Sequence, residues 1–153
     1  NKIYSLAKKL RLSAQVLELN ENIQENKEII IINYFGALKS YFKFSKSVFM
    51  GKSMIVKLKK DGGQNPIEAA KLGCKIYHGP YVYNFEEIYK ILMENGISKK
   101  IESYEKLSKN LALDLKSPLK RKNNNKYLIN KLGQKTLNNT MPIINNFLDY
   151  EIN

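Results

Sequence analysis

The sequence predicts an α/β fold: a Rossmann-like parallel sheet with flanking helices. Short apolar runs rich in β-branched residues alternate along the chain with segments of helical periodicity. The clearest run, residues 28–33 (EIIIIN), shows no polar alternation, which is typical of a strand buried on both faces of a parallel sheet. Alternation of strands and helices favours parallel strands joined by crossover helices.

The amino-terminal part of the pattern begins with Ile3, Leu6, Ala7 and Leu10 at helical spacing. We expect the following elements there: a helix at 1–12, a strand at 14–19, a polar turn at 20–27, a strand at 28–33, a short helix at 36–45 and a strand at 47–51.

The rest of the pattern begins with a Lys- and Gly-rich loop at 52–64. Asn65 then opens a helix, with Pro66 at its first position and a stop at Gly73, and Asn84 caps a second helix that ends at Gly96. We also expect a strand at 74–78, a short strand at 97–102, and helices from Tyr104 onward, interrupted near Pro118 and at 121–126.

Length and composition limit the class of protein. The 153 residues, 43% of them hydrophobic, suit one folded domain with a real core. Cys74 is the only cysteine, which excludes an internal disulfide, and no apolar run approaches the ~20 residues that span a bilayer. The net charge of +12 comes almost entirely from Lys, whereas surfaces that read phosphate or bases lean on Arg, so it is weak evidence for nucleic acid.

The densest candidate site is the segment 61–68 (DGGQNPIE). Gly62 and Gly63 let the backbone approach a ligand closely, and the helix that follows presents free amides to an anion such as a nucleotide phosphate. Glu68 could accept hydrogen bonds from both hydroxyls of a ribose. The alternative is structural: Asn65 and Glu68 have the spacing of a capping box, which would account for these two residues but not for the glycines.

Other positions give weaker indications. His78, the only histidine, ends a predicted strand but has no visible partner base. Gly36 could bring a helix terminus to a phosphate, and Lys52 and Ser53 follow a predicted strand where they could contact a phosphate oxygen. Dinucleotide fingerprints, phosphate loops, zinc helices and nucleophile elbows are all absent from the sequence, so dehydrogenase, kinase, metalloprotease and hydrolase interpretations lack support.

Taken together, these motifs resemble a known family. The segments 49–53 (FMGKS), 62–70 (GGQNPIEAA), 72–73 (LG), 79–80 (GP) and 84–88 (NFEEI) are similar, in order and spacing, to the carboxyl-terminal half of 3-deoxy-D-manno-octulosonic acid (Kdo) transferases. The resemblance covers roughly residues 28–98.

The resemblance implies a two-domain GT-B glycosyltransferase that transfers Kdo from CMP-Kdo, with inversion and without a metal or other cofactor, to a lipid A precursor. It places the enzyme at the cytoplasmic face of the bacterial inner membrane, beside an anionic lipid surface. Residues 1–153 then form part of the donor-binding domain, with a core at 14–102 and a helical region at 103–150. The acceptor domain, the membrane anchor and the general-base glutamate are expected upstream of Asn1, and the fragment alone is expected to be inactive.

Carried over by position, the resemblance also implies a donor site. Asn65 and Glu68 would contact the CMP, and the nucleotide-binding set is Phe35, Gly36, Ala37, Lys52, Ser53, Gly62, Gly63, Gln64, Asn65 and Glu68. The chain departs from the usual family pattern at four positions: it has Ala37 where Glu is common, Asp61 where His is common, Lys52 where Gly is common and Tyr81 where His is common.

Two alternatives stay open. Another GT-B transferase, with a different nucleotide sugar, would share a glycine-rich loop followed by a helix-borne Glu. A basic nucleic-acid-binding module is favoured only by the charge of +12, and we expect no nucleic-acid partner.

Overall fold

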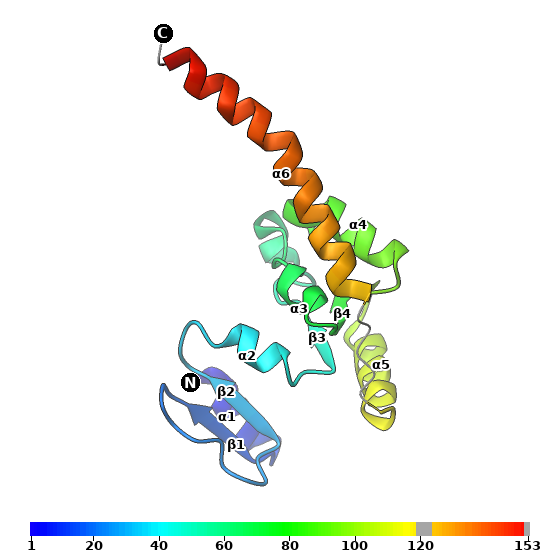
Figure 1. Cartoon of the computed structure of the whole chain (residues 1–153). Helices are drawn as coiled ribbons and strands as arrows, with labels where there is room; N and C mark the ends of the chain where they lie inside the picture. Colours follow the sequence, from blue (N-terminus) through cyan, green and yellow to red (C-terminus); the bar gives the residue numbers. More distant parts are fainter. Residues whose placement is uncertain (119–123, 152–153) are drawn as a thin grey trace. The chain divides into compact units, whose positions relative to one another are not determined.

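The structure is a computed structural model that describes residues 1–118 and 124–151. The chain divides into two compact units, Asn1–Leu38 and Lys39–Asn153, and each is described by itself. Figure 1 gives the labels of the helices and strands.

The first unit holds a helix and two parallel strands. They are α1 (Lys2–Lys9), β1 (Ala14–Leu17) and β2 (Ile29–Ile32). The side chain of Asn1 caps α1 by accepting a hydrogen bond from the Ile3 amide at 3.0 Å. β1 pairs in parallel with β2, with Ala14 opposite Ile29, and α1 contacts both strands.

The expectation that residues 28–33 form a strand buried on both faces is wrong in this unit. The strand is present as β2, but its side chains are at best half-buried, and Ile32 is 37% exposed. Among the described residues of this unit, α1 is the one helix that packs on the two strands. Because it has only eight residues and lies on one face of the strands, the other face is left without a helix to bury it.

The second unit contains a three-stranded parallel sheet in the order β3–β4–β5. Val48 lies opposite Ile76, which in turn lies opposite Ser98. The strands are β3 (Ser47–Phe49), β4 (Lys75–His78) and β5 (Ser98–Lys100). The helices are α2 (Leu38–Phe42), which begins at the boundary of the units, the 3-10 helix η1 (Val56–Asp61), α3 (Ile67–Lys71), the 3-10 helix η2 (Tyr83–Phe85), α4 (Glu86–Glu94), α5 (Tyr104–Lys116) and α6 (Asn124–Glu151).

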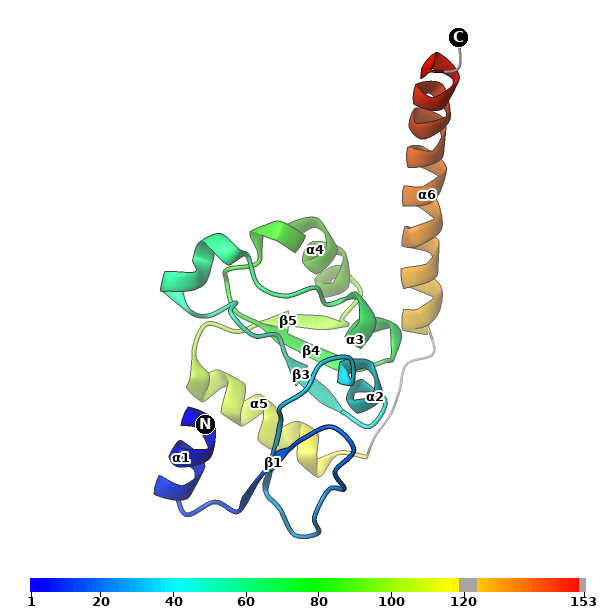
Figure 2. The same cartoon turned by 90° about the vertical axis from the view of Figure 1, so that its left-hand side faces the viewer.

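Helices cover both faces of this sheet. Ile76 packs in a core with Ala69 of α3 and Leu92 of α4, whereas its neighbour Tyr77 points to the other face and packs with Leu107 of α5. Figure 2 shows α5 on one side of the sheet and α3 and α4 on the other. The predicted fold class, parallel strands with flanking helices, is confirmed.

Several boundaries differ from the sequence expectations. The helix expected at 36–45 has only five residues, and part of the loop expected at 52–64 forms η1. The helix expected from Asn65 begins at Ile67. Asn84 does not cap α4: it lies inside η2, because its side-chain amide finds the carbonyl oxygen of Asp61 at 2.8 Å instead.

The interruption expected at 121–126 is partly wrong, because residues 124–126 already belong to the last helix. α5 ends at Lys116, and α6 begins at Asn124 and contacts α3; residues 119–123, among them Arg121, lie outside the described part of the chain. Within the described residues, no helix combines the length and the apolar character that crossing a membrane requires.

Candidate functional site

Three loops of the second unit meet beyond the carboxyl ends of its strands. One follows β3, one follows β4, and the third joins η1 to α3. Ser53, in the first loop, joins it to the second: its carbonyl oxygen accepts from the Tyr81 amide at 2.9 Å, and its hydroxyl accepts from the Gly79 amide at 2.8 Å. This is the edge at which open α/β sheets bind their ligands.

The hydroxyl of Ser53 is fully engaged inside the protein. The residue is 0% exposed, and its hydroxyl also donates to the Met50 carbonyl at 2.6 Å. The side chain therefore holds two loops together, and a direct contact between Ser53 and a donor stays a prediction.

The two glycines of the third loop pack against the loop after β4. Both have positive φ, +64° at Gly62 and +76° at Gly63. A Cβ at Gly62 would lie 2.7 Å from Cγ of Asn84, and one at Gly63 would lie 3.1 Å from the Tyr81 carbonyl oxygen. The sequence interpretation assigned these glycines to close approach by a ligand; the structure gives them a left-handed backbone and a close approach by another loop.

Two side chains of the η2–α4 segment anchor the same loop. Asn84 donates from its side-chain amide to the Asp61 carbonyl, and the hydroxyl of Tyr89 donates to the Gln64 carbonyl at 2.8 Å. Sequence reasoning missed Tyr89, because an aromatic residue on a helix reads as ordinary core. Gln64 itself is exposed, while its backbone carbonyl is fixed by the hydrogen bond from Tyr89.

Asn65 and Glu68 form only half of a capping box. The side-chain oxygen of Asn65 accepts from the Ile67 amide at 2.9 Å. Glu68 does not return the bond; its side chain is 51% exposed, and Oε2 lies 3.7 Å from Nζ of Lys39. Capping therefore accounts for Asn65, whereas the Glu68 carboxylate points into solvent with acceptor capacity to spare.

Lys52, in the loop after β3, has a strained backbone. Its φ is +65°, unusual for a residue other than glycine. Its ammonium group lies 3.9 Å from Oδ2 of Asp61, and both side chains are about half exposed. The ion pair is weak at such exposure and leaves the ammonium free to exchange partners.

Phe35, Gly36 and Ala37 belong to the first unit. Phe35 is fully exposed and Ala37 is half-buried. Gly36 has a φ of +90° and nothing within 4 Å of a Cβ built on it. This open, left-handed turn follows β2, and its part in a donor site stays a prediction.

His78 is buried and is not placed to touch a ligand. The residue is 1% exposed, its Nδ1 lies 2.8 Å from the Gly79 carbonyl oxygen, and its ring stands 4.3 Å from that of Tyr89. Nε2 has no hydrogen-bond partner among the described residues. Burial lowers the pKa of His78; the bond to Gly79 opposes this shift and the charge of Lys100 adds to it.

A cavity of about 360 Å³ adjoins the loop after β4. Its lining includes Lys59 and Lys60 of η1, the rings of Tyr81 and Tyr83, and the carboxylate of Glu86. The cavity therefore presents two cations, one anion and two aromatic rings beside the glycine loop.

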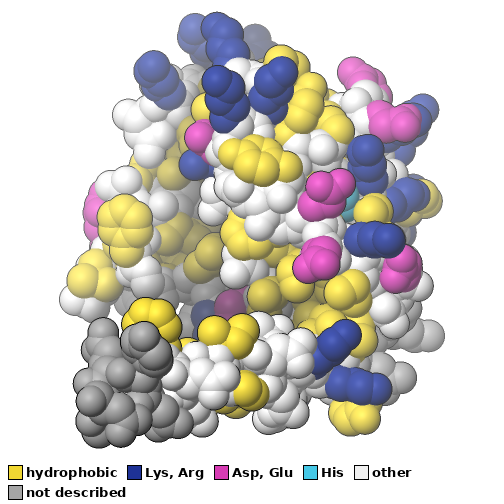
Figure 3. Space-filling view, turned by 90° about the horizontal axis from the view of Figure 1, so that it is seen from above, with side chains coloured by type: hydrophobic (Ala, Val, Ile, Leu, Met, Phe, Trp, Pro, Cys, Tyr) yellow, Lys and Arg dark blue, Asp and Glu magenta, His cyan; other side chains and the backbone are white. Residues whose placement is uncertain are grey.

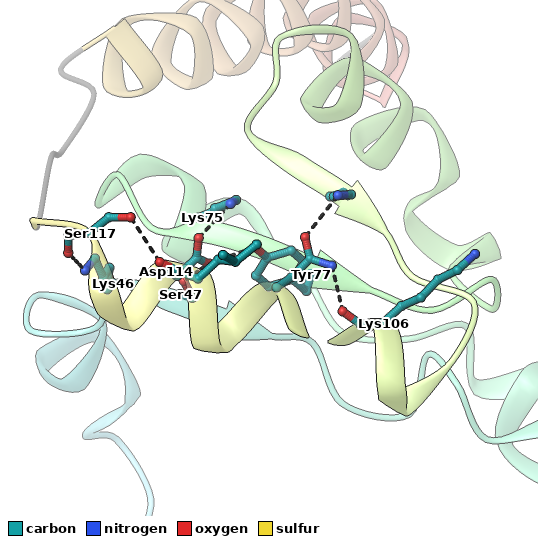
Figure 4. A network of polar contacts seen from close by, with 10 residues as sticks. Lys46, Ser47, Lys75, Tyr77, Lys106, Asp114 and Ser117 are labelled. Atoms are coloured by element: carbon teal, nitrogen blue, oxygen red, sulfur yellow. Dashed lines mark hydrogen bonds and ion pairs between the residues drawn. The ribbon is translucent and has the colours of Figure 1, made fainter. Parts of the chain in front are cut away.

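A second cavity, of about 420 Å³, lies at the opposite edge of the sheet, where β3 and β4 begin. Its acidic residue, Asp114 of α5, accepts hydrogen bonds from Ser47, Lys75 and Tyr77 at 2.6–2.7 Å (Figure 4). Burial alone would raise the pKa of Asp114, but these donors outweigh burial and lower it. The carboxylate is saturated by the protein itself, so its role is to fasten α5 to the sheet.

On the face in Figure 3, several basic side chains gather along the upper edge, whereas basic, acidic and apolar side chains are mixed on the right-hand part.

The chain is similar in sequence and in fold to known proteins. No family model matches the chain. A curated 3-deoxy-D-manno-octulosonic acid transferase of Haemophilus influenzae is 30% identical over 94 residues, which are 61% of this chain and 21% of that protein. The crystal structure of the C-terminal CMP-Kdo binding domain of WaaA from Acinetobacter baumannii covers 87% of this chain and 65% of its own, with a TM-score of 0.67 and 16% identity.

The resemblance to Kdo transferases is confirmed. The likeness to the Acinetobacter domain is one of fold, and the likeness to the Haemophilus protein is one of sequence, at 30% identity over 94 residues. The chain spans 21% of the length of that curated Kdo transferase. The Kdo-transferase-like segments 49–53, 62–70, 79–80 and 84–88 contribute residues to the three loops at the carboxyl edge and to the η2–α4 segment beside them.

Proposed function

We propose that this chain is the donor-binding part of a Kdo transferase, a GT-B enzyme that transfers Kdo from CMP-Kdo to a lipid A precursor. The observation that carries the proposal is the meeting of the three Kdo-transferase-like loops at the carboxyl edge of β3 and β4, where Ser53 and Gly79 are joined. The likeness to a Haemophilus Kdo transferase and to a CMP-Kdo binding domain supports it.

The nucleotide is proposed to lie over residues 63–68. The exposed carboxylate of Glu68 would accept hydrogen bonds from the two ribose hydroxyls. Asn65 uses its side-chain oxygen to bind the Ile67 amide, so its amide nitrogen is the group proposed to donate to CMP.

Lysines are proposed to hold the anionic parts of the donor. CMP-Kdo carries a phosphodiester and a sugar carboxylate. Lys52 lies beside the glycine loop, and Lys59 and Lys60 line the adjoining cavity. Their combined potential would raise the local concentration of an anionic nucleotide sugar and weaken with salt.

The reaction is proposed to be a metal-independent displacement with inversion. A hydroxyl oxygen of the acceptor attacks the anomeric carbon of Kdo, the bond from that carbon to the phosphate oxygen breaks, and its electron pair leaves with CMP. The proton passes to a carboxylate that no residue of this chain is proposed to provide. Backbone amides of the glycine loop and Lys52 would stabilise the departing phosphate.

The membrane surface is the proposed setting. A net charge of +12 supports attraction to the anionic headgroups of the cytoplasmic leaflet, where the lipid acceptor would be found.

Isothermal titration of the 153-residue chain with CMP, UDP and GDP tests the proposal. We expect CMP to bind most tightly. A preference for UDP or GDP would contradict it and favour a GT-B transferase with another nucleotide sugar. Binding of random DNA at moderate salt, with no nucleotide binding, would favour the nucleic-acid module.

A further inference from the structure

Tyr89 makes an unusual connection between the core and the candidate site. The residue is 0% exposed, on the face of α4 that packs against the sheet. Its hydroxyl group nevertheless donates a hydrogen bond to a backbone atom outside that core. The acceptor is the carbonyl oxygen of Gln64, which lies 25 residues earlier in the sequence. Burial raises the pKa of Tyr89 far above that of a free phenol, so the group stays a donor at any physiological pH.

The oxygen that accepts this hydrogen bond lies where the loop enters the proposed nucleotide-binding residues. The Gln64 carbonyl belongs to the peptide plane that runs from Cα of Gln64 to Cα of Asn65, so fixing this oxygen also fixes the direction in which the chain enters Asn65. Two residues with left-handed backbone, Gly62 and Gly63, precede it. Asn84 holds the start of the same stretch at Asp61, so the loop is anchored at both ends from the η2–α4 segment.

We infer that Tyr89 is a positioning residue for nucleotide binding, acting through the Gln64–Asn65 peptide to orient Asn65 and Glu68. The inference rests on the proposed function of the loop. It does not require contact between Tyr89 and the ligand, because the ring is enclosed between α4 and the sheet and packs on His78.

The chain offers a matched control for removing this hydroxyl. Tyr77 is also 0% exposed, and its hydroxyl also makes one short bond, to Asp114 at 2.7 Å, but on the face of the sheet covered by α5. Tyr89→Phe and Tyr77→Phe therefore delete the same atom from equally buried rings, one beside the loop and one remote from it.

The experiment is titration of wild type and both variants with CMP, at a temperature below all three thermal transitions. We expect Tyr89→Phe to weaken CMP binding about two- to tenfold, the equivalent of one hydrogen bond, and Tyr77→Phe to lower the melting temperature with unchanged affinity. Amide hydrogen exchange should rise at residues 62–68 in Tyr89→Phe but not in Tyr77→Phe.

The outcomes distinguish failure of the proposed function from failure of the positioning role of Tyr89. If wild type binds no CMP, the proposed function fails; if wild type binds CMP and Tyr89→Phe binds it equally well, the positioning role is overturned. Should Tyr89→Phe not fold, Asn84→Ala removes the other anchor of the loop from an exposed side chain. Weaker CMP binding by Asn84→Ala would then support the role of the anchors, and unchanged binding would overturn it.

Discussion

The backbone of Gly79 lies so close to Ser53 that a Cβ built at position 79 would stand 2.2 Å from the Ser53 carbonyl oxygen. This contact, with the bond from the Gly79 amide to the Ser53 hydroxyl, joins the loop after β3 to the loop after β4. The site at the carboxyl edge depends on a side chain being absent at position 79.

Gly79→Ala should therefore destabilise the second unit. The added methyl group must displace backbone atoms, which costs about 1–3 kcal/mol in a packed interior. Gly51→Ala is the matched control, because a Cβ at Gly51 meets nothing within 4 Å. Urea denaturation of both variants measures the effect; equal stability of the two would contradict the close packing described here.

Glu68→Gln should weaken nucleotide binding without loss of stability. The carboxylate is exposed and takes no part in capping, so the fold does not need its charge. Loss of a charged acceptor for hydroxyl groups corresponds to about a 10- to 100-fold weaker CMP affinity.

Glu94→Gln, at the end of α4, is the control for that substitution. Titration calorimetry and thermal denaturation separate binding from stability. A fall in melting temperature with unchanged affinity would restore the purely structural interpretation of Glu68.

Stability should fall on acidification below about pH 6.5 because of His78. Burial lowers its pKa beneath the ordinary value of 6.5, so the unfolded state takes up a proton that the folded state resists. The free energy of unfolding then decreases as pH falls below 6.5, by at most about 1.4 kcal/mol per pH unit, and is unaffected above it.

His78→Phe should flatten this dependence between pH 7.5 and 5.5, measured by urea denaturation. Asp114 does not interfere, because its pKa is lowered from 3.8 and its contribution is lost only at lower pH. An unchanged slope in His78→Phe would assign the effect to another group.

Asp114→Asn should be clearly destabilising. The substitution weakens bonds from Ser47, Lys75 and Tyr77 at a carboxylate that is only 13% exposed, at an expected cost of about 2 kcal/mol. Glu102→Gln breaks an exposed ion pair with Lys106 and should have no measurable effect. Thermal denaturation compares the two, and similar losses would show that Asp114 is no special fastening point.

Strands were the part of the fold most open to prediction, and contacts distant in sequence were the least. The runs around Ile30, Val48 and Ile76 all form strands, because a short apolar run between turn residues has few other stable states. Asn84 was predicted to be a cap from local spacing, but its amide pairs with Asp61, 23 residues earlier. Local rules cannot anticipate a partner that folding brings near.

In the candidate site too, some features could be predicted from the sequence and others could not. The sequence predicts that glycine is needed at Gly62 and Gly63, but a ligand and a neighbouring loop impose the same requirement, and only the structure distinguishes them. The bond from Tyr89 to Gln64 leaves no trace in the sequence, because its acceptor is a backbone atom common to every residue.

The packing of Gly62 against Asn84 and of Gly63 against Tyr81 has a thermodynamic consequence for any ligand of this loop. The loop acquires its shape when the protein folds, so its conformational entropy is already lost before a ligand arrives. Little of the binding free energy then goes into ordering the loop. Association at this site should accordingly show only a small unfavourable conformational entropy and leave the backbone of residues 61–65 unchanged.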